Sequence, residues 1–369
     1  MKVNVLQENL LKALVHTSRI ISTKPQLPIL QHVHLSVIGN RFRVAATNLE
    51  TTETVWVGAK IEEDGGLCVP ARLLTELVST LPAEAVSLAV DEGSLLLSCG
   101  KTKATIPGVA ASEYPPIAEV SRKNAVKVPK DIFLPAIFSV IFSSATDEGR
   151  PLLTGVKIQA SDGDQTTMAT TDGYRLSVKA LPFATPLSQD LVVPARALGE
   201  VAKLLSENKE AESLEILPVG DGQLGFAVGE TEILTRLIDG EYPNYKKIIP
   251  SSSTTKAAVD KEEFTRAVKS AAIFARDNSN IIKLRVEKGL VAVSANTPHV
   301  GENQVELSAT VEGDGGEIAF NSRFLLEFLG NTPNRDIIFE MTGSLNPGAF
   351  KIEGDSTYLH IIMPVRLQN

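Results

Sequence analysis

The sequence is poor in the residues on which cross-linking, metal binding and catalysis depend. Its 369 residues include two cysteines, five histidines and one tryptophan, and aromatic residues make up 5% of the chain. Two cysteines cannot provide a disulfide framework that stabilises a chain of this length, and neither Cys68 nor Cys99 has a Cys or His neighbour at metal-ligand spacing. We predict that both are small buried hydrophobic residues, and we expect no metal and no cofactor.

Long apolar runs are also missing. No run approaches the roughly 20 residues that a membrane-spanning helix needs, and residues 1–5 (MKVNV) lack the apolar core and cleavage site of a signal peptide. We therefore expect a cytoplasmic protein without membrane contact. Hydrophobic residues (43%) and charged residues (22%) are in the proportions of a folded soluble protein, and the length favours two or three domains.

Excess positive charge is absent as well, because the formal net charge is -8. Phosphate affinity depends on Lys and Arg displacing counterions, so this total argues against indiscriminate coating of nucleic acid. A basic surface confined to one part of an acidic protein would give the same total and stays open.

No catalytic motif fits its required context. Residues 220–225 (GDGQLG) match the dinucleotide fingerprint in form, but they contain an Asp-Gly turn and precede a strand-like FAV where that site needs a helix. His32 and His34 lie two apart on one face of a predicted strand, without a third metal ligand nearby. The remaining histidines, His16, His299 and His360, are isolated from any nucleophile.

What the chain does contain is a threefold repeat. Residues 67–77 (LCVPARLLTEL) recur at 191–201 (LVVPARALGEV) and more loosely at 318–328 (IAFNSRFLLEF). Two further markers keep a similar spacing: ATN at 46–48, TTD at 170–172 and AN at 295–296, and EYP at 113–115 and 241–243. Three markers with one spacing predict three copies of one domain.

Each copy shows the same order of elements. An amphipathic helix comes first, with apolar residues near Leu11, Leu14, Val15 and Ile21, then at 133–141, then at 264–272. A shorter helix follows, with Leu73, Leu74, Leu77 and Val78 in the first copy, 198–205 in the second and 324–329 in the third. Runs such as 51–57 (TTETVWV), with Asp-Gly turns at 64, 162, 221 and 314, predict antiparallel hairpins. Each copy is thus predicted to be α+β.

Three segments carry a resemblance to a known family: TTDGYRLS at 170–177, MPVRL at 363–367 and KPQLPIL at 24–30. Together with the repeat and the length, they resemble the bacterial DNA polymerase III beta subunit family over the whole chain. The resemblance implies the DNA-clamp fold, with two helices packed on antiparallel sheets in each of three domains, at residues 1–122, 123–250 and 251–369.

The family resemblance also implies a function. It implies a DNA sliding clamp, a non-enzymatic processivity factor that encircles duplex DNA without sequence preference and tethers polymerases, the clamp loader and repair proteins. Two chains would join head to tail into a closed ring lined by their helices. The sheet edges near Lys103–Ile106 and Val300–Gln304 would pair between chains, with Ile273 and Phe274 as apolar anchors.

Several cations are candidates for DNA contact. Arg72, Arg196 and Arg323 share one early position of the second helix, each four residues before a Glu, so a surface ion pair and a cation facing phosphates are both open. Lys24 and Arg150 match places where the family contacts DNA. The cations off the apolar stripes either face the hole or lie on solvated faces: Lys12, Arg19, Lys203, Arg266, Lys269 and Arg276.

The resemblance further implies a peptide-binding pocket between the second and third domains. Its residues would be Leu153, Thr171, Gly173, Tyr174, Arg175, Leu176, Pro243, Lys247, Ile248, Ile361, Met363, Pro364, Val365 and Arg366. Met, Pro and aliphatic walls with a few cations suit a short peptide with apolar anchors. The family often has His where this chain has Tyr174, which leaves the peptide preference open.

Two rival functions come from other classes. A nucleotide-dependent enzyme would use residues 220–225, and bound dinucleotide would reveal it. A triplicated scaffold that binds peptides but never DNA would lack retention on circular DNA.

Overall fold

The structure is a computed structural model, and it describes residues 1–147, 149–159, 165–183, 189–220, 222–298 and 300–366. These residues form two compact units, which we describe separately. The first unit comprises Met1–Lys130 and Lys203–Leu237, and the second comprises Asp131–Ala202 and Ile238–Asn369. His299, Leu367 and the Asp-Gly turns at 162 and 221, named from the sequence, fall wholly or partly outside the described residues.

The helices are separated by runs of strands, and two helices fall in each copy, as the repeat predicts. The described α-helices are α1 (Gln7–Ser18), α2 (Ala71–Ser79), α3 (Lys130–Ile141), α4 (Ala195–Glu207), α5 (Lys261–Ala275) and α6 (Ser322–Gly330). Short 3-10 turns are η1 (Pro28–Gln31), η2 (Ala111–Glu113), η3 (Pro151–Thr154) and η4 (Tyr245–Ile248). Side-chain caps begin two helices: Asp260 accepts from the Glu263 amide at the start of α5, and Asn321 accepts from the Arg323 amide at the start of α6.

The first unit contains two antiparallel sheets. The smaller has the order β5 (Ala59–Glu63), β1 (Lys2–Leu6), β7 (Ala85–Asp91), β8 (Ser94–Cys99) and β9 (Thr102–Pro107). The larger has the order β10 (Val109–Ala110), β6 (Gly66–Pro70), β2 (His32–Ile38), β3 (Arg41–Thr47), β4 (Thr51–Val57), β18 (Thr231–Arg236), β17 (Gln223–Val228), β16 (Ser213–Gly220) and β11 (Val126–Pro129).

The second unit repeats this plan. Its larger sheet has the order β15 (Leu191–Pro194), β12 (Gly155–Gln159), β13 (Thr166–Thr171), β14 (Arg175–Leu181), β27 (Asp355–Ile362), β26 (Gly348–Ile352), β25 (Ile337–Met341), β19 (Thr255–Val259) and β23 (Thr310–Gly313). Its smaller sheet has the order β22 (Gly301–Ser308), β21 (Leu290–Thr297), β20 (Ile281–Glu287) and β24 (Gly316–Asn321).

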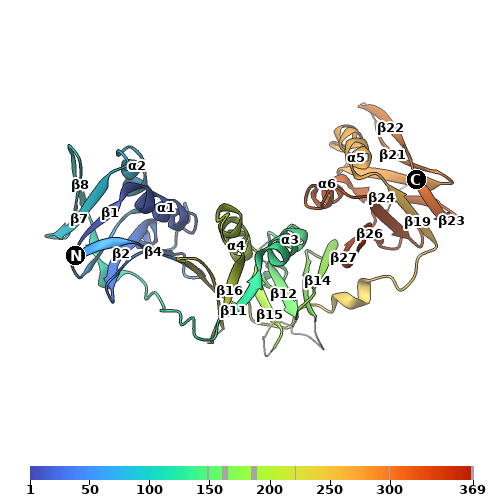
Figure 1. Cartoon of the computed structure of the whole chain (residues 1–369). Coiled ribbons are helices and arrows are strands. Elements are labelled where there is room, and N and C mark those ends of the chain that lie inside the picture. Colours follow the sequence, from blue (N-terminus) through green and yellow to red (C-terminus); the bar gives the residue numbers. More distant parts are fainter. Residues whose placement is uncertain (148, 160–164, 184–188, 221, 299, 367–369) are drawn as a thin grey trace. The chain divides into compact units, whose positions relative to one another are not determined.

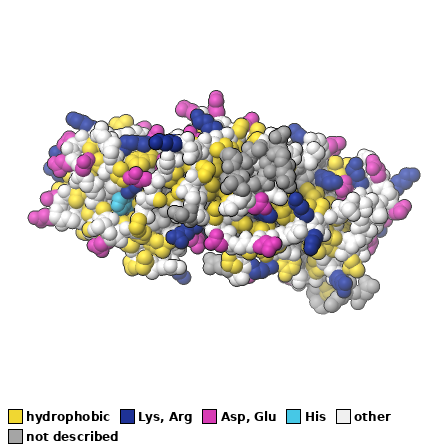
Figure 2. Space-filling model, turned by 90° about the horizontal axis from the view of Figure 1, so that it is seen from below, with side chains coloured by type: hydrophobic (Ala, Val, Ile, Leu, Met, Phe, Trp, Pro, Cys, Tyr) yellow, Lys and Arg dark blue, Asp and Glu magenta, His cyan; other side chains and the backbone are white. Residues whose placement is uncertain are grey.

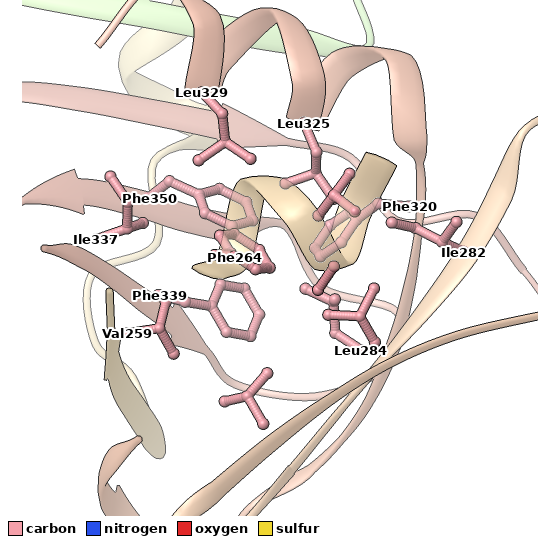
Figure 3. Packing of buried hydrophobic residues seen from close by; sticks show 14 of the residues in the cluster. Val259, Phe264, Ile282, Leu284, Phe320, Leu325, Leu329, Ile337, Phe339 and Phe350 are labelled. Carbon is pink, nitrogen blue, oxygen red and sulfur yellow. The ribbon is translucent and has the colours of Figure 1, made fainter. Parts of the chain in front are cut away.

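Each unit has a core that draws on two sheets and two helices. In the first unit, α1 and α2 pack side by side (Figure 1), and Leu14 and Leu74 join Val3 of β1 and Val44 of β3 in one buried cluster. In the second unit, α5 and α6 pack side by side over the strands. Figure 3 shows four phenylalanines of that core converging, and the Phe320 and Phe339 rings meet edge to face at 6.0 Å.

The helix stripes agree with the sequence only in part. In α3 and α5 the predicted apolar residues are buried, apart from the last of each set, which are half-buried. In α1 the prediction was wrong: the buried stripe is Leu10, Ala13, Leu14 and Thr17, while Val15 is exposed and the helix ends at Ser18. Leu73 of α2 is also exposed. Polar Thr17 completes the α1 stripe by donating to the Ala13 carbonyl, which a count of apolar residues does not detect.

The Asp-Gly turns were also predicted correctly only in part. Strands β16 and β17 pair on either side of residue 221, as a hairpin requires. The turns at 64 and 314 instead carry the chain between sheets, because β5 pairs with β1 and β6 with β2, and β23 pairs with β19 and β24 with β20. Gly65 and Gly315 adopt positive φ at these crossings, so the motif marks backbone geometry and not hairpin pairing.

Candidate functional site

The two sequence segments that carry the family resemblance meet at one end of a strand pair. In the antiparallel pairing of β14 with β27, Arg175 lies opposite Ile362 and Leu176 opposite Ile361. The Met363 amide then donates a hydrogen bond of 2.8 Å to the Tyr174 carbonyl. Segments nearly 190 positions apart are therefore brought into direct contact.

Apolar residues support this junction from beneath. Leu176 and Ile361 are fully buried and belong to one cluster with Tyr242, Tyr245 and Ala349. Leu153 and Thr171 are buried as well. These predicted pocket residues lie buried beneath the surface, and we call them the floor of the site. The exposed residues of the predicted pocket are available to contact a partner. We call the exposed and half-exposed set the docking surface: Gly173, Tyr174, Pro243, Lys247, Ile248, Met363, Pro364, Val365 and Arg366.

The turn between β13 and β14 is fixed by its own side chains. Asp172 Oδ1 accepts hydrogen bonds from the amides of Tyr174 (2.8 Å) and Arg175 (3.0 Å). Thr171 Oγ1 donates to the Arg175 carbonyl and accepts from the Gly173 amide. Gly173 has φ +93°, a conformation that glycine adopts without strain. The turn thus presents Tyr174 in one orientation.

Arg175 holds this turn from inside and does not face a partner. Its side chain is 7% exposed, and Nε donates to Asp172 Oδ2 at 3.1 Å while Nη2 donates to the Phe142 carbonyl at 2.6 Å. Nη1 forms an ion pair of 2.6 Å with Glu327 of α6. The guanidinium also lies 4.7 Å from the centre of the Phe324 ring. The group is buried and its contacts are all within the chain, so Arg175 is a supporting residue.

The exposed part of the site includes two residues that the sequence did not single out. The Tyr174 ring, in a residue that is 60% exposed, stacks on Phe324 of α6 at 6.5 Å. Leu345 is also exposed and lies on the turn that leads into β26, whose first residue, Gly348, is paired with Ile362. Neither belongs to a motif: stacking on Tyr174 places Phe324 beside the docking surface, and the pairing of Gly348 with Ile362 places the turn that carries Leu345 near the end of β27.

The same turn recurs in the first unit. Asn48 Oδ1 accepts from the amides of Glu50 and Thr51, and Thr47 Oγ1 donates to the Thr51 carbonyl. The Arg236 amide donates to the Glu50 carbonyl, as Met363 does to Tyr174. The repeated ATN and TTD segments are therefore one hydrogen-bonded turn, used twice.

The repeated EYP segments complete that turn. The Tyr114 hydroxyl accepts from the Thr47 amide at 3.1 Å, and the Tyr242 hydroxyl accepts from the Thr171 amide at 3.1 Å. Burial raises the pKa of both tyrosines to about 12, so each phenol stays neutral and can also donate to a carbonyl. These markers recur because they hold the turn and not because they bind a ligand.

The floors beneath the two turns differ. Where Leu176 faces Ile361 in the second unit, Thr52 faces Leu234 in the first. Next to them, the Thr51 and Thr235 hydroxyls are 3.4 Å apart. A threonine-rich floor cannot hold an apolar anchor as the second does. Within the described residues, the apolar form of the junction occurs only at β14 and β27.

The candidate DNA-facing cations are exposed. Arg72, Arg196 and Arg323 each occupy the second position of their helix, as the repeat predicts. The expected ion pair forms between Arg72 and Glu76 at 2.8 Å, but Glu327 pairs with Arg175 in place of Arg323. Lys203, Lys12, Lys269 and Arg276 are exposed, and Arg266 lies 3.9 Å from Glu262.

One of the cation assignments changes with the structure, and another candidate has a second neighbouring surface. Arg19 is half-buried and forms a two-point ion pair with Glu207, so it is not available as a free cation of the lining. Arg150 is exposed but borders the docking surface, since a Cβ at position 173 would lie 3.2 Å from its Nη1. Lys24 lies in an exposed turn after α1. Figure 2 shows basic and acidic side chains interspersed on the face in view.

Of the residues expected at a dimer interface, some are exposed and others are buried. Lys103 and Gln304 are exposed on β9 and β22, each of which is an edge strand of its sheet. Ile273 is 56% exposed, whereas Phe274 is half-buried against the core. Ile106 is 3% exposed within the first core, so its side chain cannot be a contact and only its backbone is available.

The described residues offer no reactive centre. They contain no group of three His, Cys, Asp or Glu placed to bind a metal. Both cysteines are buried, and burial raises the pKa of the Cys68 thiol to about 12. His360 bonds Ser177 at 2.8 Å but is wholly enclosed, and burial, with Arg175 nearby, lowers its pKa well below the usual value. Residues 223–228 after the glycine motif form strand β17, so no dinucleotide site is built there.

Known proteins share this organisation along the whole chain. Family models for the DNA polymerase III beta subunit match residues 1–118 (N-terminal domain), 127–244 (central domain) and 246–366 (C-terminal domain). The beta sliding clamp of Streptomyces coelicolor is 30% identical over 377 residues and covers 100% of both chains. That of Staphylococcus aureus is 27% identical, with 99% of both chains covered.

Solved structures agree with these matches. The DNA polymerase sliding clamp of Bacillus subtilis superposes with a TM-score of 0.93 at 25% identity, and the beta subunit of Thermotoga maritima with 0.91 at 26%. The sliding clamp of Bartonella birtlesii, solved bound to griselimycin, gives 0.93 at 25%; each comparison covers 100% of both chains. With all three domain models matched in order, this chain belongs to the DNA polymerase III beta subunit family, the beta sliding clamps.

Proposed function

We propose that two copies of this chain close head to tail into a ring around duplex DNA, and that the docking surface tethers polymerases, the clamp loader and repair proteins to that ring. The family is that of the non-catalytic clamp subunit, so the function is mechanical retention. We place it in the cytoplasm; no described helix is long and apolar enough to cross a bilayer. We keep the domain limits at residues 1–122, 123–250 and 251–369, which the matched ranges support.

The observation that carries the proposal is a strand pairing used twice within the chain. Strand β4 follows β3 in a hairpin and pairs antiparallel with β18; β14 follows β13 and pairs antiparallel with β27. The third copy has the equivalent hairpin of β21 and β22, and the first copy has the equivalent final strand, β9, paired with β8. Both β22 and β9 are edge strands.

The two edges correspond to the two partners of this strand pairing: β22 corresponds to β4 and β14, and β9 corresponds to β18 and β27. They belong to the last and the first copy of the repeat. A β22 edge can pair with the β9 edge of a second copy in the arrangement seen at the two internal junctions. An interface between unlike surfaces propagates until its rotation closes a ring. Closure also protects edges that would otherwise favour aggregation. Exposed Lys103, Gln304 and Ile273 are the side chains we assign to this contact.

Encirclement explains why the chain needs no strongly basic surface. We assign DNA contact to Lys24, Arg72, Arg150, Arg196 and Lys203, which are all exposed. Contacts of this kind go to phosphates and carry no sequence information. Since a closed ring can leave only at a DNA end, weak contacts suffice and permit sliding, in keeping with the net charge of -8.

Tethering depends on the docking surface. A partner held by a short peptide on a ring that stays on DNA meets its substrate at a high effective concentration, so modest affinity gives long tracts of synthesis. Weak binding also lets partners exchange on one ring. The apolar floor at Leu176 and Ile361 and the exposed Tyr174 and Met363 suit a peptide with apolar anchors. The Bartonella clamp bound to griselimycin supports a ligand site on this fold.

Retention on circular DNA tests the proposal. The clamp loader is expected to place the protein on a nicked circle, where it should remain through gel filtration, and linearising the circle should release it. Release from the circle at the same rate as from linear DNA would refute encirclement. Peptide binding without any loading would favour the rival scaffold that never binds DNA.

A further inference from the structure

A hollow of about 290 Å³ adjoins the docking surface in the second unit. One wall is the segment that leads into the third copy, and the other walls are strands β25, β26 and β27 with the turn between β25 and β26. Its lining residues are Ile249–Ser253, Glu340–Thr342, Pro347, Ala349, Lys351 and Leu359. None of them belongs to the docking surface as defined above.

Strand pairing places the hollow next to that surface. Ala349 lies opposite Ile361, so the hollow begins one strand away from the floor of the docking surface. Gly348 pairs with Ile362, which sets Pro347 beside Met363. Ala349 belongs to the same buried cluster as Leu176 and Ile361, and Leu359 packs against that cluster. A bound peptide that continues from Met363 past Pro347 would therefore enter the hollow.

The chemistry of the lining suits an extended peptide. Ile249, Ala349 and Leu359 supply apolar walls, and the exposed serines 251–253 supply hydroxyls and backbone amides for which the described residues show no hydrogen-bond partner. Lys351 Nζ pairs with Glu340 Oε2 at 2.7 Å, so the charges at this wall are balanced. The volume lies at the low end for ligand sites and fits one side chain with its backbone.

We propose that this hollow is an accessory subsite that binds the residues flanking the clamp-binding segment of a partner polymerase. The inference rests on the proposed tethering function, because the same peptide must first occupy the docking surface. The occupant is an uncharged extended segment with one apolar side chain between Ile249 and Leu359 and its backbone along the serines. Such a contact would discriminate between partners that share similar anchors but differ in their flanks.

Two synthetic peptides test the subsite by calorimetry. One is the minimal clamp-binding segment of the replicative polymerase of the same organism, and the other carries the native flanking residues on both sides. The longer peptide is expected to bind more tightly than the shorter one by roughly tenfold or more, since full burial of one apolar side chain corresponds to a gain of at least about that size. Ser252→Tyr, which fills the hollow from an exposed position, should remove this gain and leave the minimal peptide unchanged.

Ser356→Tyr is the matched control, because Ser356 is an exposed serine of β27 that does not line the hollow. It should leave both affinities as in the unmodified chain. Equal affinities for the two peptides, or a gain that survives Ser252→Tyr, would overturn the subsite while leaving tethering intact. Failure of the minimal peptide to bind the unmodified chain would refute the docking function and this inference with it.

Discussion

The ion pair between Arg175 and Glu327 allows a sharp comparison of two glutamates at equivalent places in the repeat. Glu76 and Glu327 each lie four residues after the arginine that the repeat places second in the helix. Glu76 pairs with Arg72, and the two side chains are 63% and 92% exposed. Glu327 is 49% exposed, but its partner Arg175 is only 7% exposed. The same substitution at both positions therefore separates a surface pair from one with a buried cation.

Glu327→Gln is expected to lower the free energy of unfolding by about 1 to 2 kcal/mol. Breaking a fully buried pair costs about 3 to 5 kcal/mol, because a charge is left without a partner. Solvent reaches Glu327 and screens its charge, and Arg175 keeps Asp172 and the Phe142 carbonyl, so the expected loss is smaller. Glu76→Gln should cost less than about 0.5 kcal/mol.

Thermal unfolding of both variants measures the difference. The midpoint of Glu327→Gln should fall by about 3 to 6 °C, and that of Glu76→Gln by less than about 2 °C. Because Arg175 also holds Asp172 and thereby the turn that presents Tyr174, Glu327→Gln should weaken peptide binding severalfold in calorimetry. Equal midpoints for the two variants would show that the buried guanidinium does not need Glu327, and the account of the turn would be wrong.

Three further perturbations test the remaining assignments. Ile273→Asp is expected to weaken the dimer at least tenfold in sedimentation equilibrium, because it places a charge in an apolar contact, and an unchanged dimer would move the interface elsewhere. Lys24→Ala with Arg150→Ala should flatten the salt dependence of DNA affinity by about one unit per lost phosphate contact, whereas an unaltered slope would place both residues off the DNA. Lowering the pH from 7 to 5 should lower the unfolding midpoint, because burial and the nearby Arg43 lower the pKa of His34 to about 4. The unfolded chain then binds a proton below about pH 6.5 that the folded chain excludes, so stability is lost as the pH falls from there toward 4, and His34→Asn should reduce this dependence.

The repeat made the architecture predictable, because three copies of one pattern constrain one another. The positions of the second helices followed from the repeat and its apolar spacing, the 51–57 strand followed from its β-branched run, and both agree with the structure. The buried face of α1 could not be predicted from apolar spacing, because it includes the polar residues Thr17 and Gln7. Their side chains donate hydrogen bonds to backbone carbonyls and occupy positions where an apolar residue would be expected. The hairpins predicted at residues 64 and 314 were wrong for a related reason. An Asp-Gly pair indicates the local backbone conformation, whereas the sheet to which a strand belongs depends on partners far along the chain.

The family resemblance implied a set of residues for the peptide pocket, and that set stays a prediction, but it did not indicate which of them are buried and which are exposed. The family resemblance implies that Arg175 and Leu176 are among the contacts, whereas the structure buries both. Exchanging the pair for alanine would therefore test the strand junction as much as peptide binding, and Tyr174→Ala isolates the surface better. Phe324 and Leu345 were not expected near the site because their positions depend on contacts between distant segments: Phe324 stacks on Tyr174, and Leu345 lies on the turn before β26, whose Gly348 pairs with Ile362.

Triplication followed by divergence accounts for how one turn came to serve several purposes. Two copies have the turn and the tyrosine whose hydroxyl hydrogen-bonds to it: Asn48 with Tyr114 in the first, and Asp172 with Tyr242 in the second. The second has Leu176 facing Ile361 beneath the turn, while the first has Thr52 facing Leu234. The third copy offers the open edge of β22 in place of an internal partner. On the proposed function, we therefore expect the described residues of each chain to provide one docking surface and a ring of two chains to carry two, which is enough for one partner to bind before another leaves. The expected number of tethered partners then follows from which floor is apolar, and not from the number of repeats.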